Sequence, residues 1–136
     1  MPTRYLLDTN NCIYIQRQKP GEVLARFQKL KPGDAATSVI TWGELLFGAE
    51  KSRQRKKALQ LLEKFKTLVP VLSIPENAGK TYGATRASLE SKGTSICNND
   101  LWIAAHAKAV TLTIVTNNER DFQGIPGLKV QNWVGR

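Results

Sequence analysis

Four acidic side chains of this basic chain stand beside apolar residues instead of among lysines and arginines. Asp8 follows an apolar stretch, Glu44 and Asp100 each precede one, and Asp121 precedes Phe122. Burying a carboxylate costs several kcal/mol unless a partner compensates its charge, and gathered carboxylates repel one another unless a cation neutralises them. The pattern therefore predicts a divalent-cation site.

The remaining acids mostly occupy ordinary surface contexts. Glu22, for example, has Arg26 at helical spacing, an arrangement typical of exposed helices. We expect no chemistry from the acids of this kind, which are Glu22, Asp34, Glu50, Glu63, Glu76 and Glu90.

The carboxylate oxygens of the acids in apolar contexts are hard ligands for metal ions. If Asp8, Glu44 and Asp100 converge, their oxygens suit Mg²⁺ or Mn²⁺ with several retained waters. Such an ion activates a water, orients it toward a phosphodiester and stabilises charge on the leaving oxygen. Basic residues around such a cleft would hold the backbone of a nucleic acid.

Short apolar stretches that alternate with amphipathic stretches would position these acids. The expected strands are 5–7, 36–39, 71–74, 112–115 and an edge strand at 129–130. The expected helices are 12–18, 22–30, 41–48, 52–67, 75–91, 100–109 and a short turn at 119–122. This order predicts an α/β fold over residues 1–136, one domain with a mainly parallel central sheet flanked by helices.

The expected strand ends favour a common cleft, because ligands of parallel sheets bind at the carboxyl ends of the strands. Asp8 and the segment 116–121 directly follow strands, whereas Glu44 and Asp100 lie in first helical turns. Thr41 is placed to cap the helix of Glu44, which would complete a Thr-x-x-Glu capping box. That capping role and a position facing a cleft are compatible.

The helix of Asp100 has its own expected cap. We expect Asn98 and Asn99 to cap this helix, whose dipole favours a carboxylate in the first turn.

The composition limits the class of protein. The chain has 136 residues, of which 41% are apolar, enough for one continuous core. Its formal charge of +9, from 20 Lys and Arg against 11 Asp and Glu, favours a polyanionic partner. A nucleic acid is the first expectation and an anionic membrane surface the second, while a role in solubility alone stays open.

Targeting and cysteine signals are sparse. No signal-peptide core follows Met1 and no apolar run approaches a membrane span, so we expect a soluble, cytoplasmic protein. Cys12 and Cys97 lack the paired spacing of zinc sites and are expected to be reduced core residues. His106 is the single histidine and is expected to be packed or half-exposed in its helix.

Four ordered motifs surround the acids. They are Leu7-Asp8-Thr9-Asn10, Thr41-Trp42-Gly43-Glu44-Leu45, Asn98-Asn99-Asp100-Leu101-Trp102-Ile103-Ala104-Ala105-His106-Ala107 and Val115-Thr116-Asn117-Asn118. With Phe122 and Trp133 further on, they resemble PIN-domain ribonucleases and, more narrowly, the VapC toxins of bacterial toxin–antitoxin modules. The resemblance runs from Asp8 to Trp133.

The resemblance implies a PIN-like fold and a metal-dependent endoribonuclease. The implied reaction is Mg²⁺-dependent cleavage of structured RNA, commonly a tRNA or a ribosomal RNA loop, which inhibits translation and arrests growth. Asp8 and Asp100 match metal-binding aspartates of the family. Glu44 matches the second acidic position, which helps to bind metal or to position water.

The fourth acidic position departs from the family pattern. Where many members have an aspartate after the last core strand, this chain has Asn118, followed by Glu119 and Asp121. Asn118 can bind water through its amide but supplies no charge. The resemblance then implies one tightly held metal, with a second recruited by RNA phosphate and Asp121.

The resemblance also implies partners. Such toxins are homodimers neutralised by a small VapB-type antitoxin in a higher assembly, and they reach operator DNA only through the antitoxin. No membrane partner is implied. Trp42 and Phe47 fit an interface or the core equally well, and Cys97 stands where close relatives often have glycine.

Two other functions use parts of the same pattern. A phosphatase of the haloacid-dehalogenase type also has an aspartate after its first strand, but it needs a second acid where this chain has Asn10. A non-catalytic RNA- or DNA-binding module would explain the positive charge without using the four acids.

Overall fold

A five-stranded sheet forms the centre of the fold. The computed structural model describes residues 2–135. All four strand pairings are parallel, in the order β3-β2-β1-β4-β5. The strands are β1 (Tyr5–Leu7), β2 (Ala35–Ser38), β3 (Val71–Leu72), β4 (Thr113–Val115) and β5 (Val130–Gln131). The predicted α/β fold with a parallel sheet is confirmed.

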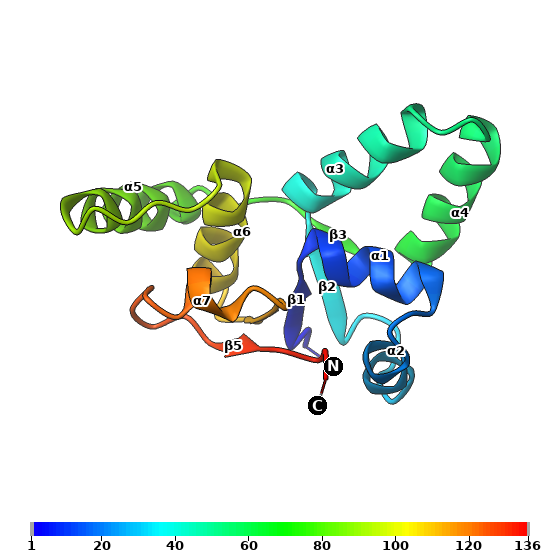
Figure 1. Ribbon diagram of the computed structural model, residues 1–136, viewed down its shortest axis with the longest axis horizontal. Coiled ribbons are helices and arrows are strands. Elements are labelled where there is room, and N and C mark those ends of the chain that lie inside the picture. Colours follow the sequence, from blue (N-terminus) through cyan, green and yellow to red (C-terminus); the bar gives the residue numbers. More distant parts are fainter. Residues whose placement is uncertain (1, 136) are drawn as a thin grey trace.

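The helices cover this sheet and extend beyond it. They are α1 (Thr9–Arg17), α2 (Gly21–Gln28), α3 (Val39–Glu50), α4 (Arg55–Leu68), α5 (Asn77–Ser91), α6 (Asn98–Ala109) and α7 (Glu119–Phe122). Figure 1 shows α3 and α4 as a hairpin that projects to one side of the sheet, whereas α5 projects to the other side beside α6. None of the helices within residues 2–135 has the length and apolar character needed to cross a membrane.

The sheet separates two apolar layers. Consecutive residues of a strand point to opposite faces, so Leu6 and Leu7 of β1 enter different layers. Leu7 packs in one buried cluster with residues of α1 to α4, and Leu6 packs in another with Ile103 and Ala104 of α6. Because β1 lies at the middle of the sheet, Asp8 leaves it at the centre of the carboxyl edge.

Several predicted helix starts are wrong by two or three residues: α1 begins at Thr9 instead of residue 12, and α4 begins at Arg55 instead of residue 52. Helix α3 begins at Val39, and Ser38 caps it by accepting a hydrogen bond from the Ile40 N–H at 3.2 Å. Because β2 passes into α3 without a loop, Thr41 is a buried residue of the first turn and no capping box forms with Glu44. Helix α6 begins at Asn98, earlier than the expected start at Asp100.

The start of α6 also changes the role of its asparagines. Cys97 occupies the N-cap without a side-chain hydrogen bond, so Asn98 and Asn99 belong to the first turn instead of capping it. Both cysteines are free, as predicted, but only Cys12 is in the core. Cys97 is exposed and belongs to neither apolar layer, although its neighbour Ile96 packs against the layer that contains Leu6.

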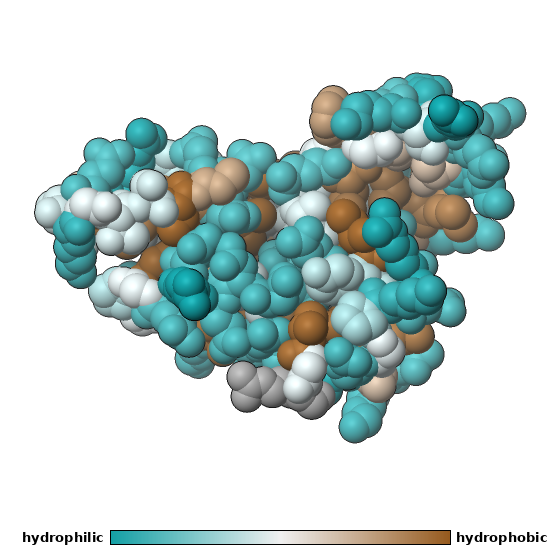
Figure 2. All heavy atoms as spheres, viewed as in Figure 1, coloured by the Kyte–Doolittle hydropathy of each residue, from teal (hydrophilic) through white to brown (hydrophobic). Residues whose placement is uncertain are grey.

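The space-filling view shows where the surface departs from a polar coat. Hydrophobic atoms gather at the α3–α4 hairpin and its junction with α1 (Figure 2). A groove at this junction is lined by apolar side chains that include Ile13, Leu45, Ala49 and Leu61. This groove is separate from the acidic side chains that follow the strands, apart from Glu44 at its edge.

Candidate active site

Asp8 is fixed at the carboxyl end of the central strand. Its side chain is only 7% exposed and caps α1. Oδ1 accepts hydrogen bonds from the Asn11 backbone N–H at 2.8 Å and from Asn11 Nδ2 at 2.9 Å. The carboxylate is therefore held in one orientation by neutral donors.

Glu44 lies in α3 and is approached from two other helices. Its Oε1 accepts a hydrogen bond from the Thr9 hydroxyl of α1 at 2.5 Å. Its Oε2 lies 3.4 Å from Asn99 Nδ2 in the first turn of α6. The start of α1, the second turn of α3 and the start of α6 thus meet at this carboxylate.

Asp100 shares the same electrostatic environment. Burial is the main cause that raises the pKa of its half-buried carboxyl, and the charges of Asp8, Glu44 and Asp121 raise it further. The pKa of Asp8 is raised by burial first and by Glu44 in addition, while hydrogen bonds from Asn11 and Thr116 oppose the shift. The charges of the four acids predicted from their apolar contexts therefore act on one another, and we name Asp8, Glu44, Asp100 and Asp121 the carboxylate cluster.

Asn118 and Asp121 form the rim of this cluster. Asn118 is exposed, and its Nδ2 donates a hydrogen bond to Asp121 Oδ2 at 2.6 Å. The Asn118 backbone N–H donates to Thr116 Oγ1 at 3.0 Å, which fixes the turn after β4. Glu119 instead accepts a hydrogen bond from Asn132 Nδ2 at 2.9 Å, toward the C-terminal segment.

Four neutral residues of the site were not predicted as site residues from the sequence. Thr9, Asn11, Asn99 and Thr116 hold the carboxylates or the turn beside them. In the sequence they are ordinary helix-start and turn residues. Their positions in the sequence could have identified them, since each lies within three residues of a predicted acid or directly after a strand.

The donor chemistry fits a hard divalent cation. None of the ion pairs among residues 2–135 involves the cluster, because they join Arg4 to Asp34, Arg55 to Glu50 and Arg86 to Glu90. The carboxylates of Asp8, Glu44, Asp100 and Asp121 therefore have no basic partner within 4.0 Å among residues 2–135. Carboxylate oxygens are the ligands preferred by Mg²⁺ and Mn²⁺.

The arrangement is gathered but not closed around an ion. In the part of the chain that the structure describes, no three His, Cys, Asp or Glu side chains already stand in a metal-holding arrangement. Like charges repel, and the neutral donors Asn11 and Thr9 hold Asp8 and Glu44 in separate hydrogen bonds. Metal ligation by Asp8, Glu44 and Asp100 stays a prediction.

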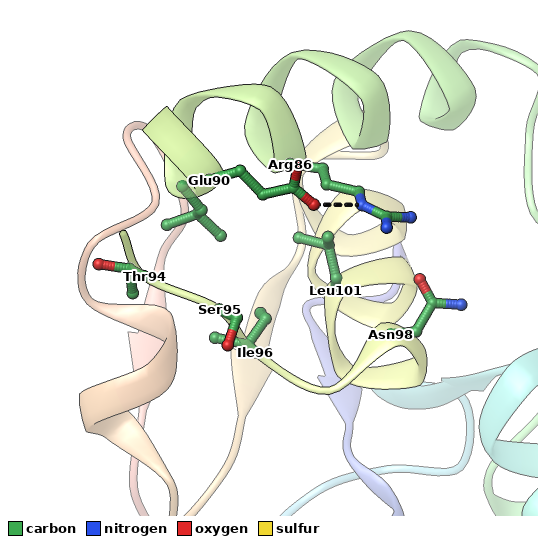
Figure 3. Close-up of a pocket in the computed structure, with 8 residues that line it drawn as sticks. Arg86, Glu90, Thr94, Ser95, Ile96, Asn98 and Leu101 are labelled. Carbon is green, nitrogen blue, oxygen red and sulfur yellow. Dashed lines mark hydrogen bonds and ion pairs between the residues drawn. The ribbon is translucent and has the colours of Figure 1, made fainter. Parts of the chain in front are cut away.

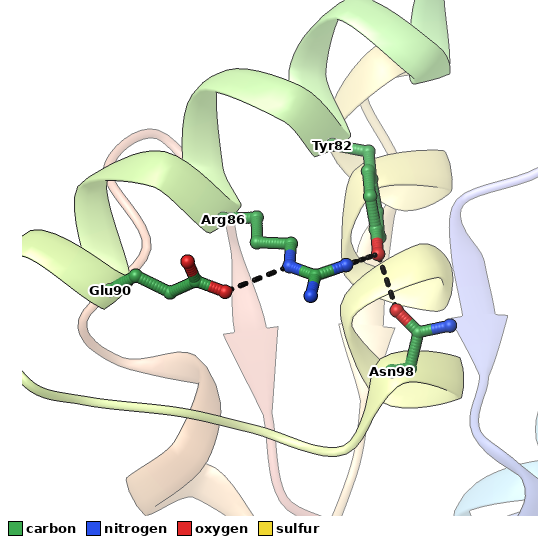
Figure 4. Close-up of polar contacts among 4 residues, drawn as sticks. All are labelled: Tyr82, Arg86, Glu90 and Asn98. Atoms are coloured by element: carbon green, nitrogen blue, oxygen red, sulfur yellow. Dashed lines mark hydrogen bonds and ion pairs between the residues drawn. The ribbon is translucent and has the colours of Figure 1, made fainter.

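Helix α5 braces the first turn of α6, which carries Asp100. The Tyr82 ring stacks on Trp102 with centroids 3.9 Å apart and an interplanar angle of 10°. Figure 4 shows the Tyr82 hydroxyl donating to Asn98 Oδ1, while Arg86 donates to that hydroxyl at 2.9 Å and to Glu90 at 2.9 Å. This chain of contacts ends two residues before Asp100.

The hollow beside these contacts does not have the features of a ligand site. Figure 3 shows a hollow between α5 and the loop that leads into α6, with the Arg86–Glu90 ion pair at its edge. It has a volume of about 130 Å³, well below the roughly 300 Å³ of small ligand pockets, and none of the cluster's acids lines it. Its charged residues neutralise each other.

His106 connects the two helices that carry Asp100 and Glu44. It is fully buried, in agreement with the expected packed state, and its Nδ1 lies 2.9 Å from Ser38 Oγ at the start of α3. Burial lowers the pKa of the imidazole, so the neutral form is favoured. A neutral hydrogen bond thus ties α6 to the N-cap of α3.

The chain is similar to a known family over most of its length. The family model of the PIN domain matches residues 5–128. Ribonuclease VapC2 of Haemophilus influenzae is 37% identical over 131 residues, which cover 96% of this chain and 98% of the relative. The tRNA(fMet)-specific endonuclease VapC of Salmonella typhimurium is 38% identical over 130 residues, which cover 96% and 98%.

Solved structures of toxin–antitoxin complexes have the same fold. VapBC from Salmonella typhimurium, bound to DNA, matches with a TM-score of 0.88 and 37% identity over 96% of this chain and 98% of that chain. VapBC2 from Rickettsia felis, bound to a promoter fragment, matches with a TM-score of 0.87 and 34% identity over 96% and 99%. The chain therefore belongs to the PIN-domain family and, within it, to the VapC ribonucleases.

Proposed function

We propose that this chain is a divalent-cation-dependent endoribonuclease, the toxin of a toxin–antitoxin module, which cleaves structured RNA and so inhibits translation. The observation that carries the proposal is the carboxylate cluster, whose charges raise the pKa of Asp8 and Asp100 and which has no basic partner within 4.0 Å among residues 2–135. A tRNA is the favoured substrate, because a relative 38% identical to the chain is named a tRNA(fMet)-specific endonuclease. Family membership argues against the phosphatase and the non-catalytic binding module.

The neutral residues around the acids prepare the site. Asn11 holds Asp8 at the edge of the sheet, and Thr9 and Asn99 orient Glu44. Asp8, Glu44 and Asp100 would hold Mg²⁺ or Mn²⁺, which supplies water activation and charge stabilisation on the leaving oxygen when bound. The exposed amide of Asn118 can hydrogen-bond water or a phosphate oxygen at the rim, where Asp121 orients it.

The substrate reaction tests this proposal directly. Purified protein is incubated with total tRNA and with Mg²⁺, Mn²⁺ or EDTA, and fragment ends are mapped by sequencing. We expect cleavage with either ion, none with EDTA, and none from Asp8→Asn or Asp100→Asn. Cleavage that persists in EDTA, or in both variants, would contradict the proposed reaction.

We further propose that an antitoxin covers this chain and links it to operator DNA. Several similar solved structures are VapBC complexes, and two of these include DNA. The apolar groove between α1 and the α3–α4 hairpin offers a seat for an apolar antitoxin segment, and Leu61 at its edge is 49% exposed. Co-expression of the Leu61→Asp variant with the antitoxin should reduce complex recovery while RNA cleavage is retained.

Self-association and location complete the proposal. Phe47 and Val39 of α3 are 62% and 43% exposed, and burying them in a homodimer would remove apolar surface from water. Light scattering should report a dimer for the wild type and a monomer for Phe47→Ser, and a wild-type monomer at high concentration would contradict this step. A ribonuclease of cellular tRNA would act in the cytoplasm as a single domain spanning residues 1–136.

A further inference from the structure

The segment that joins α3 to α4 concentrates positive charge. Five basic residues occur within residues 51–57, and we name this set the basic tip: Lys51, Arg53, Arg55, Lys56 and Lys57. All five are exposed, and Glu50 is the one acid adjacent to them in sequence. Figure 1 places the tip at the end of the hairpin that projects from the sheet.

Most of this charge is not neutralised. Arg55 is held by Glu50, with distances of 2.5 Å to Oε1 and 3.1 Å to Oε2. Lys51 Nζ lies 4.6 Å from the Phe47 ring centroid, a contact that leaves the ammonium in water. Within residues 2–135, no ion pair or side-chain hydrogen bond engages Arg53, Lys56 or Lys57.

The helix itself disfavours cations at this place. Arg55, Lys56 and Lys57 form the first turn of α4, where the helix dipole is positive and repels them. Gln54 occupies the N-cap without a side-chain hydrogen bond, so the first N–H groups of α4 are not capped. An anion at the tip would relieve both defects, since uncapped N–H groups and cations bind phosphate oxygens.

The tip stands at a defined distance from the carboxylate cluster. Lys51 follows Glu44 by seven residues along α3, so the rise of a helix separates them by about 10 Å. The tip is a projecting surface with charges side by side, which fits a chain of phosphates better than a single small anion. A substrate bound at the cluster would have to extend several nucleotides to reach it.

We propose that the basic tip binds the sugar-phosphate backbone of the RNA substrate, several nucleotides from the cleaved bond. This inference rests on the proposed ribonuclease function for its choice of partner. Phosphate contacts position a nucleic acid without reading its sequence. The tip therefore supplies affinity and register, whereas the carboxylate cluster supplies the cleavage chemistry.

A matched pair of double variants tests this inference. Lys56→Gln/Lys57→Gln removes two charges from the tip, and Lys31→Gln/Lys129→Gln removes two exposed lysines that precede β2 and β5, at the opposite edge of the sheet. Glutamine keeps helix propensity close to that of lysine. Cleavage of tRNA and of a dinucleotide is measured at several salt concentrations, and tRNA binding is measured separately in EDTA.

The tip variant should raise KM for tRNA about tenfold, with kcat within about twofold of wild type. The slope of log KM against log salt should fall by about 0.7 for each phosphate that the variant no longer neutralises. Dinucleotide cleavage should not change, because a dinucleotide does not reach the tip. The Lys31→Gln/Lys129→Gln protein should behave as wild type in every assay.

Three results would overturn the inference: unchanged KM and salt slope in the tip variant, equal effects in both double variants, or an equal effect with the dinucleotide. Failure of the proposed function gives a different result, because a wild-type protein that cleaves no RNA still reports tip binding in EDTA. Weaker tRNA binding by the tip variant alone would then support the tip as a binding surface without the nuclease.

Discussion

The carboxylate cluster and the basic tip differ in how their charges are held, although helix α3 contributes to both. Asp8 and Glu44 accept short hydrogen bonds from neutral donors that fix their orientation. Arg53, Lys56 and Lys57 extend into water without partners in the described part of the chain. The carboxylates are thus held by hydrogen bonds within the fold, whereas the basic side chains of the tip are exposed to solvent.

Catalysis and substrate binding place different requirements on these two regions. Chemistry at one bond requires oxygens placed to within a fraction of an ångström, so their supports must be rigid. Binding along a phosphate backbone tolerates mobile side chains, because the attraction acts over several ångströms and many phosphates are equivalent. Substitutions in the cluster should therefore change kcat, and substitutions in the tip should change KM.

The largest expected effect is that of Asp8→Asn on cleavage. Asparagine also caps helices well, so α1 should persist and the thermal unfolding temperature should not fall. Loss of one carboxylate ligand should reduce kcat for tRNA about a thousandfold, while RNA affinity changes little. Asp34→Asn, the same change before β2, serves as the control. An Asp8→Asn protein with near wild-type kcat would remove the distinction between the two regions.

Salt concentration should affect RNA binding by the basic tip more than catalysis by the carboxylate cluster. Raising monovalent salt from about 50 to about 200 mM should increase KM for tRNA roughly tenfold, because phosphate contacts release counterions. The value of kcat should stay within about twofold, since the cluster is partly buried and close pairs are screened less. Initial-rate measurements across this range check the prediction, and a salt effect confined to kcat would reverse the assignment of roles.

Removal of a neutral support should have a smaller effect than removal of a carboxylate. Thr9→Val keeps the shape of the side chain but deletes the hydrogen bond to Glu44. A hydrogen bond to a charged group contributes about 1.5 kcal/mol, so kcat should fall about tenfold with KM unchanged. Thr67→Val at the end of α4 is the matched control. A Thr9→Val enzyme with the wild-type kcat would show that Glu44 needs no such support.

The smallest effect concerns His106, which connects the helices that carry Asp100 and Glu44. Burial depresses the pKa of His106, so below pH 6.5 the unfolded chain takes up a proton that the folded imidazole resists. Stability from this residue is complete above pH 6.5 and is lost as the pH falls below it, toward the depressed folded value. The loss at pH 5 is limited to about 2 kcal/mol.

Urea unfolding at pH 7.5 and pH 5 measures this loss against a His106→Gln variant. The wild type should lose more stability than the variant between the two pH values. Equal losses would mean that burial does not lower the pKa of His106 in the folded chain.

Local sequence patterns were enough to predict most of the order of strands and helices. Alternation of short apolar stretches with amphipathic stretches predicted all five strands and the seven helices to within a few residues. It misjudged several helix starts, including those of α1, α3 and α6, because Asp8, Ser38 and Cys97 occupy their N-caps. Caps depend on where the preceding strand or loop ends, and sequence alone does not fix that point.

The sequence by itself determined which side chains carry charge, which of them sit in apolar surroundings, and the family to which the motifs belong. Only the tertiary structure decided that Thr9, Glu44 and Asn99 meet, and that the basic tip projects away from the sheet. The physical reason is the separation along the chain of the residues that interact. Apolar periodicity is a local property of the chain, whereas hydrogen bonds between residues 35 and 55 positions apart exist only after the sheet has aligned its strands.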